Sequence, residues 1–240
     1  HETVVVTLAQ SSISEFGGST TATVRRQNTD ITQPLTVSLS SSDTTEATVP
    51  TSVTIAANEA TVTFTVNAVD DSLLDGTRSL TINAAADGYI SVPASLQVTD
   101  QEILSVAILA DSISEAGGTT TVRVTRGNTD VSQALTVTLN ASPSGQISVP
   151  ATVVIPANVT EATFNLTAID DTLLDGDQNV TVSANAAGYV PASDSVVVTD
   201  FESLSFSIAA SAISENQGTT TATVTRGNTD RSQPLTVSID

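Results

Sequence analysis

The 240-residue chain contains no cysteine, methionine, tryptophan or lysine. Without cysteine it has no disulfide, no zinc–thiolate site and no thiol nucleophile. The only histidine is His1, so a nucleophile–base pair would also lack an internal imidazole. Two carboxylates could still hydrolyse a glycoside, but the tryptophan-lined sugar cleft that we would expect beside them is missing. We therefore expect no enzyme.

Aromatic residues and long apolar runs are also scarce. No apolar run approaches the roughly 20 residues that span a bilayer. The chain shows no signal peptide and begins at His1 without Met, so we expect a processed, excised or tagged chain. Only Phe16, Tyr89, Tyr189 and Phe201 lie in expected loops, which leaves little for a glycan-stacking platform. We expect both tyrosines, each preceded by glycine, to pack against a turn.

Basic residues are few, with seven arginines against 26 acidic residues and a net charge of −19. Because this charge repels nucleic acid and anionic membranes, we expect neither as a partner. The charge serves either solubility or cation binding, and composition leaves both open. Together with the missing cysteine, methionine and tryptophan, it fits an extracellular or cell-surface protein of bacterial type.

Short motifs recur at an offset of 100 residues. The recurring motifs are Ile13-Ser14-Glu15 (again at 113 and 213), Asn28-Thr29-Asp30 (128 and 228), Asp70-Asp71 with Leu73-Leu74-Asp75-Gly76 (170–176), Gly88-Tyr89 (188) and Thr99-Asp100 (199). They predict repeats over 1–100 and 101–200 and the N-terminal part of a truncated third repeat over 201–240. That last part holds about three strands, too few for a stable two-sheet core. Because Glu2 aligns with Glu102 and Glu202, we expect both ends to lie in mid-array.

Within each repeat the apolar residues alternate with Thr, Ser, Arg and Asn. In the second repeat this pattern runs through Val122 and Val124, then Leu135, Val137 and Leu139. A period of two is typical of strands with one buried face, and Gly, Pro, Asn and Asp separate the runs as turn residues. About seven strands in each repeat predict an all-β fold of tandem immunoglobulin-like sandwiches with two antiparallel sheets each.

Successive loops of a sandwich alternate between its two ends, which gathers the acidic loops at one end of each repeat. The predicted clusters are Glu15, Asp70, Asp71, Asp75, Asp100 and Glu102, and Glu115, Asp170, Asp171, Asp175, Asp200 and Glu202. Clustered carboxylates without nearby lysine favour a cation, and oxygen ligands on several loops suit Ca²⁺ better than Mg²⁺. A plain turn is the alternative for residues 70–76, with Asp71 capping local backbone and Gly76 at positive φ.

The order Ile-Ser-Glu-x-Gly-Gly, Arg-Gly-Asn-Thr-Asp, Asp-Asp-x-Leu-Leu-Asp-Gly and Val-Thr-Asp resembles the Calx-beta domain. The resemblance covers both full repeats and the start of the third. It implies a seven-strand sandwich that binds Ca²⁺ at the acidic end. The implied ligands are Glu15, Asp71, the Leu73 carbonyl, Asp75, Asp100 and Glu102, and in the second repeat Glu115, Asp171, the Leu173 carbonyl, Asp175, Asp200 and Glu202.

The sequence departs from the Calx-beta pattern at two loops. For the family's aspartate between the third and fourth strands, Asp43 or Glu46 could serve, but Pro143 and Gln146 supply no carboxylate in the second repeat. The third aspartate of the family's run after the fifth strand is Ser72 or Thr172. We therefore expect about one or two ions per domain.

Three functions remain open on the sequence. The first is a Ca²⁺-stiffened stalk, adhesin or surface filament, whose partners are neighbouring repeats of the same or an adjacent chain. The second is a module that binds a surface protein or glycan through its loops. The third is a metal-free assembly subunit completed by strands of a neighbouring chain. In the first case, we expect Asn128 or Asp130 to approach the ion of the preceding repeat.

Overall fold

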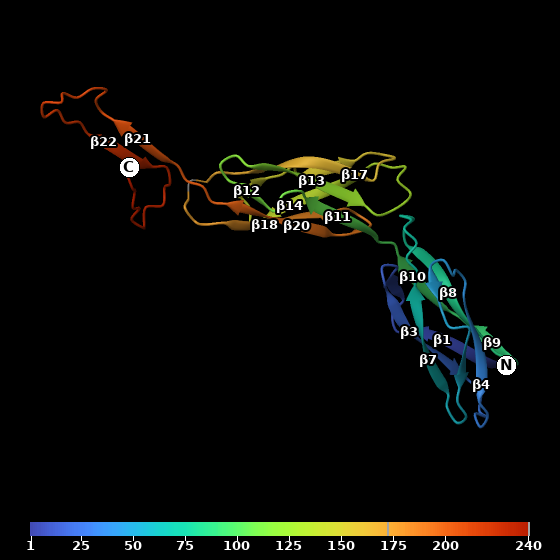
Figure 1. Ribbon diagram of the computed structural model, residues 1–240. Helices are drawn as coiled ribbons and strands as arrows, with labels where there is room; N and C mark the ends of the chain where they lie inside the picture. Colours follow the sequence, from blue (N-terminus) through green and yellow to red (C-terminus); the bar gives the residue numbers. More distant parts are fainter. Residues whose placement is uncertain (172, 240) are drawn as a thin grey trace. The chain divides into compact units, whose positions relative to one another are not determined.

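The computed structural model describes residues 1–171 and 173–239, so Thr172 lies outside the described residues. The described chain is all-β and contains no helix (Figure 1). No helix that could cross a membrane is found among these residues. The first sandwich consists of β1 (Glu2–Leu8), β2 (Ser12–Ser14), β3 (Ser19–Arg26), β4 (Leu35–Ser41), β5 (Ala47–Thr48), β6 (Ser52–Ile55), β7 (Thr61–Ala68), β8 (Arg78–Ala85), β9 (Tyr89–Val92) and β10 (Ala94–Thr99).

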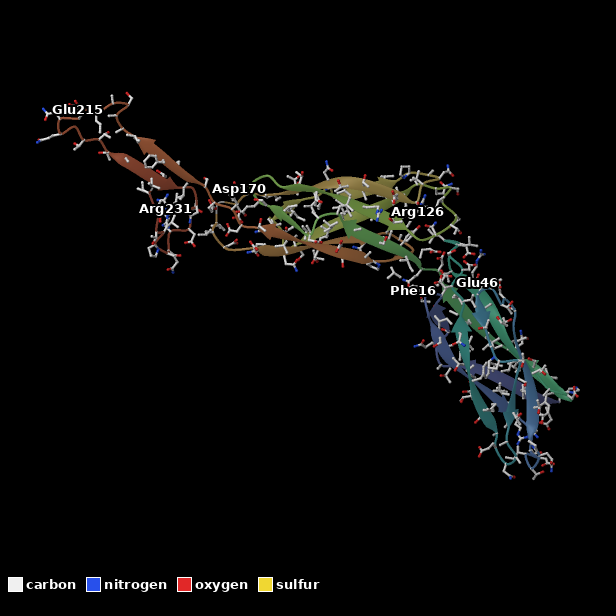
Figure 2. All side chains as sticks on the ribbon, in the orientation of Figure 1. Phe16, Glu46, Arg126, Asp170, Glu215 and Arg231 are labelled. Carbon is white, nitrogen blue, oxygen red and sulfur yellow. The ribbon has the colours of Figure 1, made fainter. Side chains whose placement is uncertain are left out.

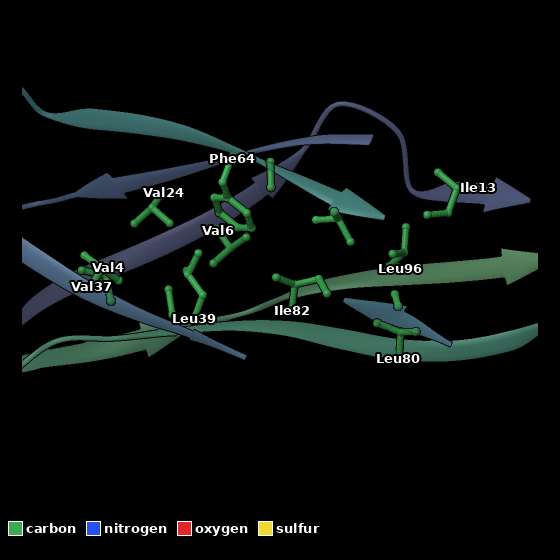
Figure 3. Packing of buried hydrophobic residues seen from close by; sticks show 14 of the residues in the cluster. Val4, Val6, Ile13, Val24, Val37, Leu39, Phe64, Leu80, Ile82 and Leu96 are labelled. Carbon is green, nitrogen blue, oxygen red and sulfur yellow. The ribbon is translucent and has the colours of Figure 1, made fainter. Parts of the chain in front are cut away.

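Two five-stranded sheets form this sandwich, in the orders β5-β7-β3-β1-β9 and β2-β10-β8-β4-β6. Their inner faces carry the alternating apolar residues of the sequence. Val4, Val24 and Val66 are fully buried from one sheet, and Val37 and Ile82 from the other. Figure 3 shows these faces meeting around Phe64 and Leu39. The core therefore follows directly from the period of two.

The edges of the sheets differ from the predicted purely antiparallel pairing. The first strand splits into β1 and β2, and the last into β9 and β10, each half joining a different sheet. As a result β1 pairs with β9, and β2 with β10, in parallel. Pro93 separates β9 from β10 and cannot donate to a ladder, which favours a break at that point.

The second sandwich repeats this arrangement 100 residues later, with sheet orders β15-β17-β13-β11-β19 and β12-β20-β18-β14-β16. Its strands are β11 (Glu102–Ile108), β12 (Ser112–Ser114), β13 (Thr119–Arg126), β14 (Leu135–Ser142), β15 (Ile147–Ser148), β16 (Thr152–Ile155), β17 (Glu161–Ala168), β18 (Gln178–Asn185), β19 (Tyr189–Val190) and β20 (Ala192–Thr199). After it comes a hairpin of β21 (Leu204–Ile208) and β22 (Ala222–Arg226).

By contacts, the chain divides into two compact units that do not coincide with the repeats. The first contains residues 1–103 with 126–132 and 187–190, and the second contains the remaining residues. The turn at 128–130 therefore belongs to the same compact unit as the first sandwich. The repeat limits at residues 100 and 200 stay predictions from the sequence.

Arg26 and Arg126 end β3 and β13, and both are buried. Their polarity predicted an exposed side chain instead. Arg26 is 4% exposed. Its guanidinium donates to the carbonyls of Glu59, Gln33, Ile31 and Ala56. Backbone acceptors thus satisfy a buried cation without a carboxylate partner. Arg26 holds together the loops at the end of the sandwich opposite to Glu15.

Candidate metal centre

Strand register brings the acidic loops of the first sandwich to one end. Ser19 at the start of β3 pairs with Asn67 near the end of β7, just before Asp70. Thr99 at the end of β10 pairs with Ser14, and its carbonyl accepts a hydrogen bond of 3.0 Å from the Glu15 N–H. These pairings confirm the predicted convergence of the loops, and Phe16 and Glu46 lie at the same end (Figure 2).

Three side chains form the centre of this end, and we call Glu15, Asp100 and Glu102 the first acidic cluster. One carboxylate oxygen from each lies within 4.8 Å of the others. Glu15 and Glu102 are each 3% exposed, and Asp100 is half-buried. Two glutamates are thus withdrawn from water beside a third carboxylate, and no arginine pairs with any of them among the described ion pairs. Burying carboxylates so close together costs free energy unless they are neutralised.

Backbone donors satisfy only part of the first acidic cluster. The Gln101 N–H donates to Glu15 Oε1 at 2.9 Å, and the Gly76 N–H donates to Asp100 Oδ2 at 2.5 Å. In contrast, Asp100 Oδ1 and Glu102 Oε1 are buried without a hydrogen-bond partner. Buried polar oxygens normally have a partner, so these two need an occupant that accepts lone pairs.

The pKa values of Glu15 and Glu102 also show that the ionised forms of these carboxylates are disfavoured. Burial raises the pKa of Glu15 from its ordinary 4.5 to about 7, opposed by the Gln101 N–H and reinforced by Asp100 and Asp70. Burial also raises the pKa of Glu102, and the charges of Asp70 and Asp100 add to the rise. Either a proton or a cation would relieve this repulsion. A bound cation would keep the carboxylates ionised.

The loop at 70–76 has the features of the plain turn that the sequence left open. Asp71 Oδ1 accepts from the Leu73 N–H at 2.9 Å, and Gly76 has φ +84°. The Leu73 carbonyl accepts from the Asp75 N–H at 2.9 Å. Asp75 also pairs with Arg78 at 2.5 Å. This loop therefore explains its own conformation, and the case for a cation rests on the buried, unpartnered oxygens beside it.

Asp43 and Glu46, the two acidic residues of the loop between β4 and β6, differ in their partners and their burial. Asp43 Oδ1 accepts from Thr45 N and Oγ1, at 3.1 and 2.6 Å, and so caps its own turn. Glu46 is 6% exposed, and burial raises its pKa, with further contributions from Asp75, Asp43 and Asp71. Glu46 is therefore the buried carboxylate of this loop, and which of the two residues would serve a cation stays a prediction.

The second sandwich carries the second acidic cluster, Glu115, Asp200 and Glu202, whose carboxylate oxygens also lie within 4.8 Å of one another. The Phe201 N–H donates to Glu115 Oε1 at 2.8 Å, and the Gly176 N–H to Asp200 Oδ2 at 2.6 Å. Asp200 Oδ1 and Glu202 Oε1 again lack a partner. The same backbone geometry thus leaves the same two oxygens unpartnered.

The surroundings of the second cluster are less acidic. Gln146 occupies the position of Glu46, and its Nε2 donates to Asp171 Oδ2 at 3.3 Å. The Leu173 N–H donates to Asp171 Oδ1 at 3.0 Å, as in the first loop. Asp170 adds to the raised pKa of Glu202, after the effect of burial.

Of the predicted ligands, the structure brings together the glutamate and the two carboxylates that close the last strand. Asp70 and Asp71 are exposed but close enough to raise the pKa of Glu102. Asp75 is turned to Arg78, and Asp175 is exposed on the equivalent loop. The ligand roles of the full predicted set stay predictions.

Sequence reasoning placed Glu46 only as one of two options and did not use Arg78 as a partner of Asp75. A signal for Glu46 was present. It directly precedes the apolar pair Ala47 and Val49, and an acidic side chain at the start of a buried strand is expected to reach the end of the sandwich. No such signal distinguishes Arg78 from any exposed arginine.

Comparison with protein families and with curated proteins gives no match. Among solved structures, the calcium-binding domain CBD12 of CALX1.1 has a TM-score of 0.35 at 12% identity, covering 75% of this chain and 79% of that one. CBD12 from CALX1.2 has a TM-score of 0.34 at 14% identity, with the same coverage. The apo-form Calx CBD1 domain has a TM-score of 0.33 at 20% identity, covering 41% of this chain and 97% of that one. These similarities are too low to carry an argument, so the site is judged on its own geometry.

Proposed function

We propose that this chain is a non-enzymatic, calcium-binding tandem-repeat module of a larger extracellular surface protein. The observation that carries the proposal is the pair of buried oxygens without partners, Asp100 Oδ1 and Glu102 Oε1, repeated at Asp200 and Glu202. Each pair lies beside a buried glutamate within a cluster 4.8 Å across. A divalent cation would supply the missing interactions and neutralise the repulsion.

Calcium suits this site because it takes about six to eight oxygen ligands in flexible geometry. The cluster offers carboxylates from two segments, Glu15 and residues 100–102, with Asp70 and Asp71 near its rim and Glu46 beside Asp71. Mg²⁺ demands a tighter octahedron and keeps its waters. Extracellular calcium modules bind at about 10⁻⁴–10⁻³ M, and a site of that strength is filled where calcium is millimolar.

Calorimetric titration of the whole chain with CaCl₂ tests the proposal, with MgCl₂ as the comparison ion. We expect saturable Ca²⁺ binding, and a melting temperature that rises with Ca²⁺ and returns to its starting value in chelator. Asp71→Asn should weaken binding in the first repeat. Asp30→Asn is the matched control, because Asp30 lies at the opposite end and accepts from the Thr32 N–H of its own turn at 3.1 Å. Identical melting curves in Ca²⁺ and chelator would refute the proposal.

Within this proposal, calcium stiffens the array as a stalk, adhesin or filament. Only Asp100 and Gln101 separate β10 from β11, and the first acidic cluster includes residues on both sides of Gln101. A cation bound there would restrain the connection itself. Small-angle scattering should show a narrower distribution of dimensions with Ca²⁺ than with chelator. Equal distributions would remove the stiffening role while leaving calcium binding intact.

A second candidate function is that of an assembly subunit, and the exposed face of the β21–β22 hairpin favours it. Leu204, Phe206 and Ile208 are each more than half exposed, whereas the equivalent Leu104 in β11 is buried. A strand from a second copy of the chain would cover this face. Light scattering after size exclusion separates the two candidates, since assembly predicts an oligomer that persists in chelator.

A further inference from the structure

The turn at 128–130 contacts the acidic loop of the first sandwich within the first compact unit. The Thr129 N–H donates to the Ser72 carbonyl at 2.9 Å, and its Oγ1 donates to the same carbonyl at 3.2 Å. The Leu74 N–H donates to Asp130 Oδ1 at 3.0 Å. Three hydrogen bonds thus hold the loop that carries Asp71 and Asp75.

The three Asn-Thr-Asp turns of the chain have the same sequence but use their aspartates differently. Asp30 Oδ1 accepts from the Thr32 N–H, and Asp230 Oδ1 accepts from the Ser232 N–H, so both cap their own turns. Asp130 Oδ1 instead accepts from Leu74 and from Asn128 Nδ2, the latter at 2.9 Å. The side chain of Asp130 is therefore directed at the preceding loop.

A second residue holds Asp130 in this orientation. The Tyr189 hydroxyl, which is buried, donates to Asn128 Oδ1 at 2.6 Å. Asn128 is 3% exposed, and its Nδ2 donates to Asp130 Oδ1. The orientation of Asn128 therefore helps to fix that of Asp130. In the first repeat Asn28 Oδ1 is buried without a partner among the described residues, and Tyr89 is only half-buried. The chain Tyr189–Asn128–Asp130–Leu74 therefore has no equivalent at the 28–30 turn.

The strained backbone of the acidic loop explains why such support matters. Ser72 has φ +63°, a left-handed conformation that is unfavourable for a non-glycine residue. The bonds from Thr129 and Asp130 hold the carbonyl of this residue and the N–H of Leu74, two positions further along the chain. Without them the loop would populate other conformations, and cation binding would have to order it first.

We propose that Asp130 is a positioning residue for the cation site of the first acidic cluster, ordering residues 72–74 through its bond to the Leu74 N–H. The inference rests on the proposed calcium function. Asp130 also adds to the raised pKa of Glu102, after burial, Asp70 and Asp100, so its charge is felt at the cluster. The role assigned here is that of an acceptor for Leu74, which a neutral asparagine can also fill.

The test uses the whole chain carrying Glu115→Gln, so that calorimetry reports the first site. Asp130→Ala removes the acceptor and should weaken Ca²⁺ binding roughly three- to tenfold, the range expected for loss of one hydrogen bond that orders the loop. Asp130→Asn keeps an oxygen for the Leu74 N–H and should stay within about twofold of the parent. Asp30→Ala, in the turn of identical sequence, should leave affinity unchanged.

A second pair of variants tests the support of Asp130. Tyr189→Phe removes the donor to Asn128 and should weaken binding in the same direction, but less than Asp130→Ala. Tyr89→Phe should have no effect on binding. In chelator, hydrogen exchange at the Leu74 amide should be faster in Asp130→Ala than in Asp130→Asn.

The outcomes separate the two proposals. If the parent binds no Ca²⁺, the calcium function fails at once, and this inference with it. If the parent binds Ca²⁺ and Asp130→Ala does not weaken it, only the positioning role is overturned. Equal weakening by Asp130→Asn and Asp130→Ala would also overturn it, because the charge of Asp130 would then act directly. Loss of Leu74 protection without loss of affinity would show that the contact is structural only.

Discussion

The first acidic cluster is buried more deeply than the second, although both are built on the same backbone frame. Glu102 is 3% exposed, whereas Glu202 is only half-buried. Around the first cluster the loop between β4 and β6 supplies Glu46, and the equivalent loop of the second sandwich supplies the neutral Gln146. The shared frame leaves the same oxygens unpartnered, so the differences lie in the number and burial of the surrounding charges.

This comparison indicates which parts of the site the repeat preserves and which it varies. Backbone N–H groups fix one oxygen of Glu15 and of Asp100, and the 100-residue repeat copies this at Glu115 and Asp200. Side chains on the rim are free to change without disturbing the sheets. We infer that the two clusters bind the same kind of ion with different affinity, and the four changes below separate them.

The largest expected effect is on the pH dependence of stability without metal. Because burial raises the folded-state pKa of Glu15 to about 7 from 4.5, the folded protein retains a proton that the unfolded chain releases. Stability is therefore full below pH 4.5 and falls as pH rises toward 7, by up to about 1.4 kcal/mol per pH unit. Urea unfolding in chelator across this range should show the fall. Glu15→Gln should flatten it more than Glu115→Gln, and equal flattening would contradict the larger rise in the pKa of Glu15.

The next effect concerns loss of either site. Glu102→Gln and Glu202→Gln each remove a carboxylate with an unpartnered oxygen. At tenfold excess over the dissociation constant, each intact site adds about 1.4 kcal/mol to stability, so each variant should lose that share of the calcium response. Calorimetric melting with Ca²⁺ and with chelator measures the loss. A calcium response that survives the double variant would place the ion elsewhere.

A smaller effect should follow from exchanging the rim residues. Glu46→Gln removes a charge near Asp71 and Asp75 and should weaken the first site by about three- to tenfold, or roughly 0.7–1.4 kcal/mol. Gln146→Glu should strengthen the second site, by less, because it also removes the bond from Gln146 to Asp171. Titration of both variants decides whether Glu46 explains the difference. If the two sites keep their order of affinity when Glu46→Gln and Gln146→Glu are combined, Glu46 does not explain the difference.

The smallest effect should come from Arg78. This arginine is half exposed and pairs with Asp75 in the first repeat, where the second has Gln178. Exposed pairs contribute about 0.2–1 kcal/mol, so Arg78→Gln should strengthen calcium binding only about twofold by releasing Asp75. The gain should be greatest at low salt. Weaker binding in Arg78→Gln would show that Arg78 orients Asp75 for the ion instead of competing with it.

Local sequence predicted much of the fold because one rule governs its core. Val4, Val24 and Val37 are buried where a period of two places them. The rule places Arg26 on the buried face with Ala22 and Val24, but a pattern of polarity does not show that four carbonyls converge on its guanidinium. It also did not predict the parallel pairs at the sheet edges. β1 and β9, for example, lie more than 60 residues apart in the sequence and pair only when the sandwich closes.

The sequence by itself determined the repeat, the strands and the end at which Glu15, Asp70 and Asp100 meet, because strand alternation and loop order are local properties. Only the tertiary structure decided which oxygens stay unpartnered, that Glu46 is buried while Asp43 is exposed, and that Asp130 accepts from Leu74 as well as from its own turn. One of the three copies of this tripeptide differs from the other two because hydrogen-bond partners are set by neighbours in space. Burial of Glu102 likewise depends on loops that lie far apart in the sequence, so no local pattern predicts it.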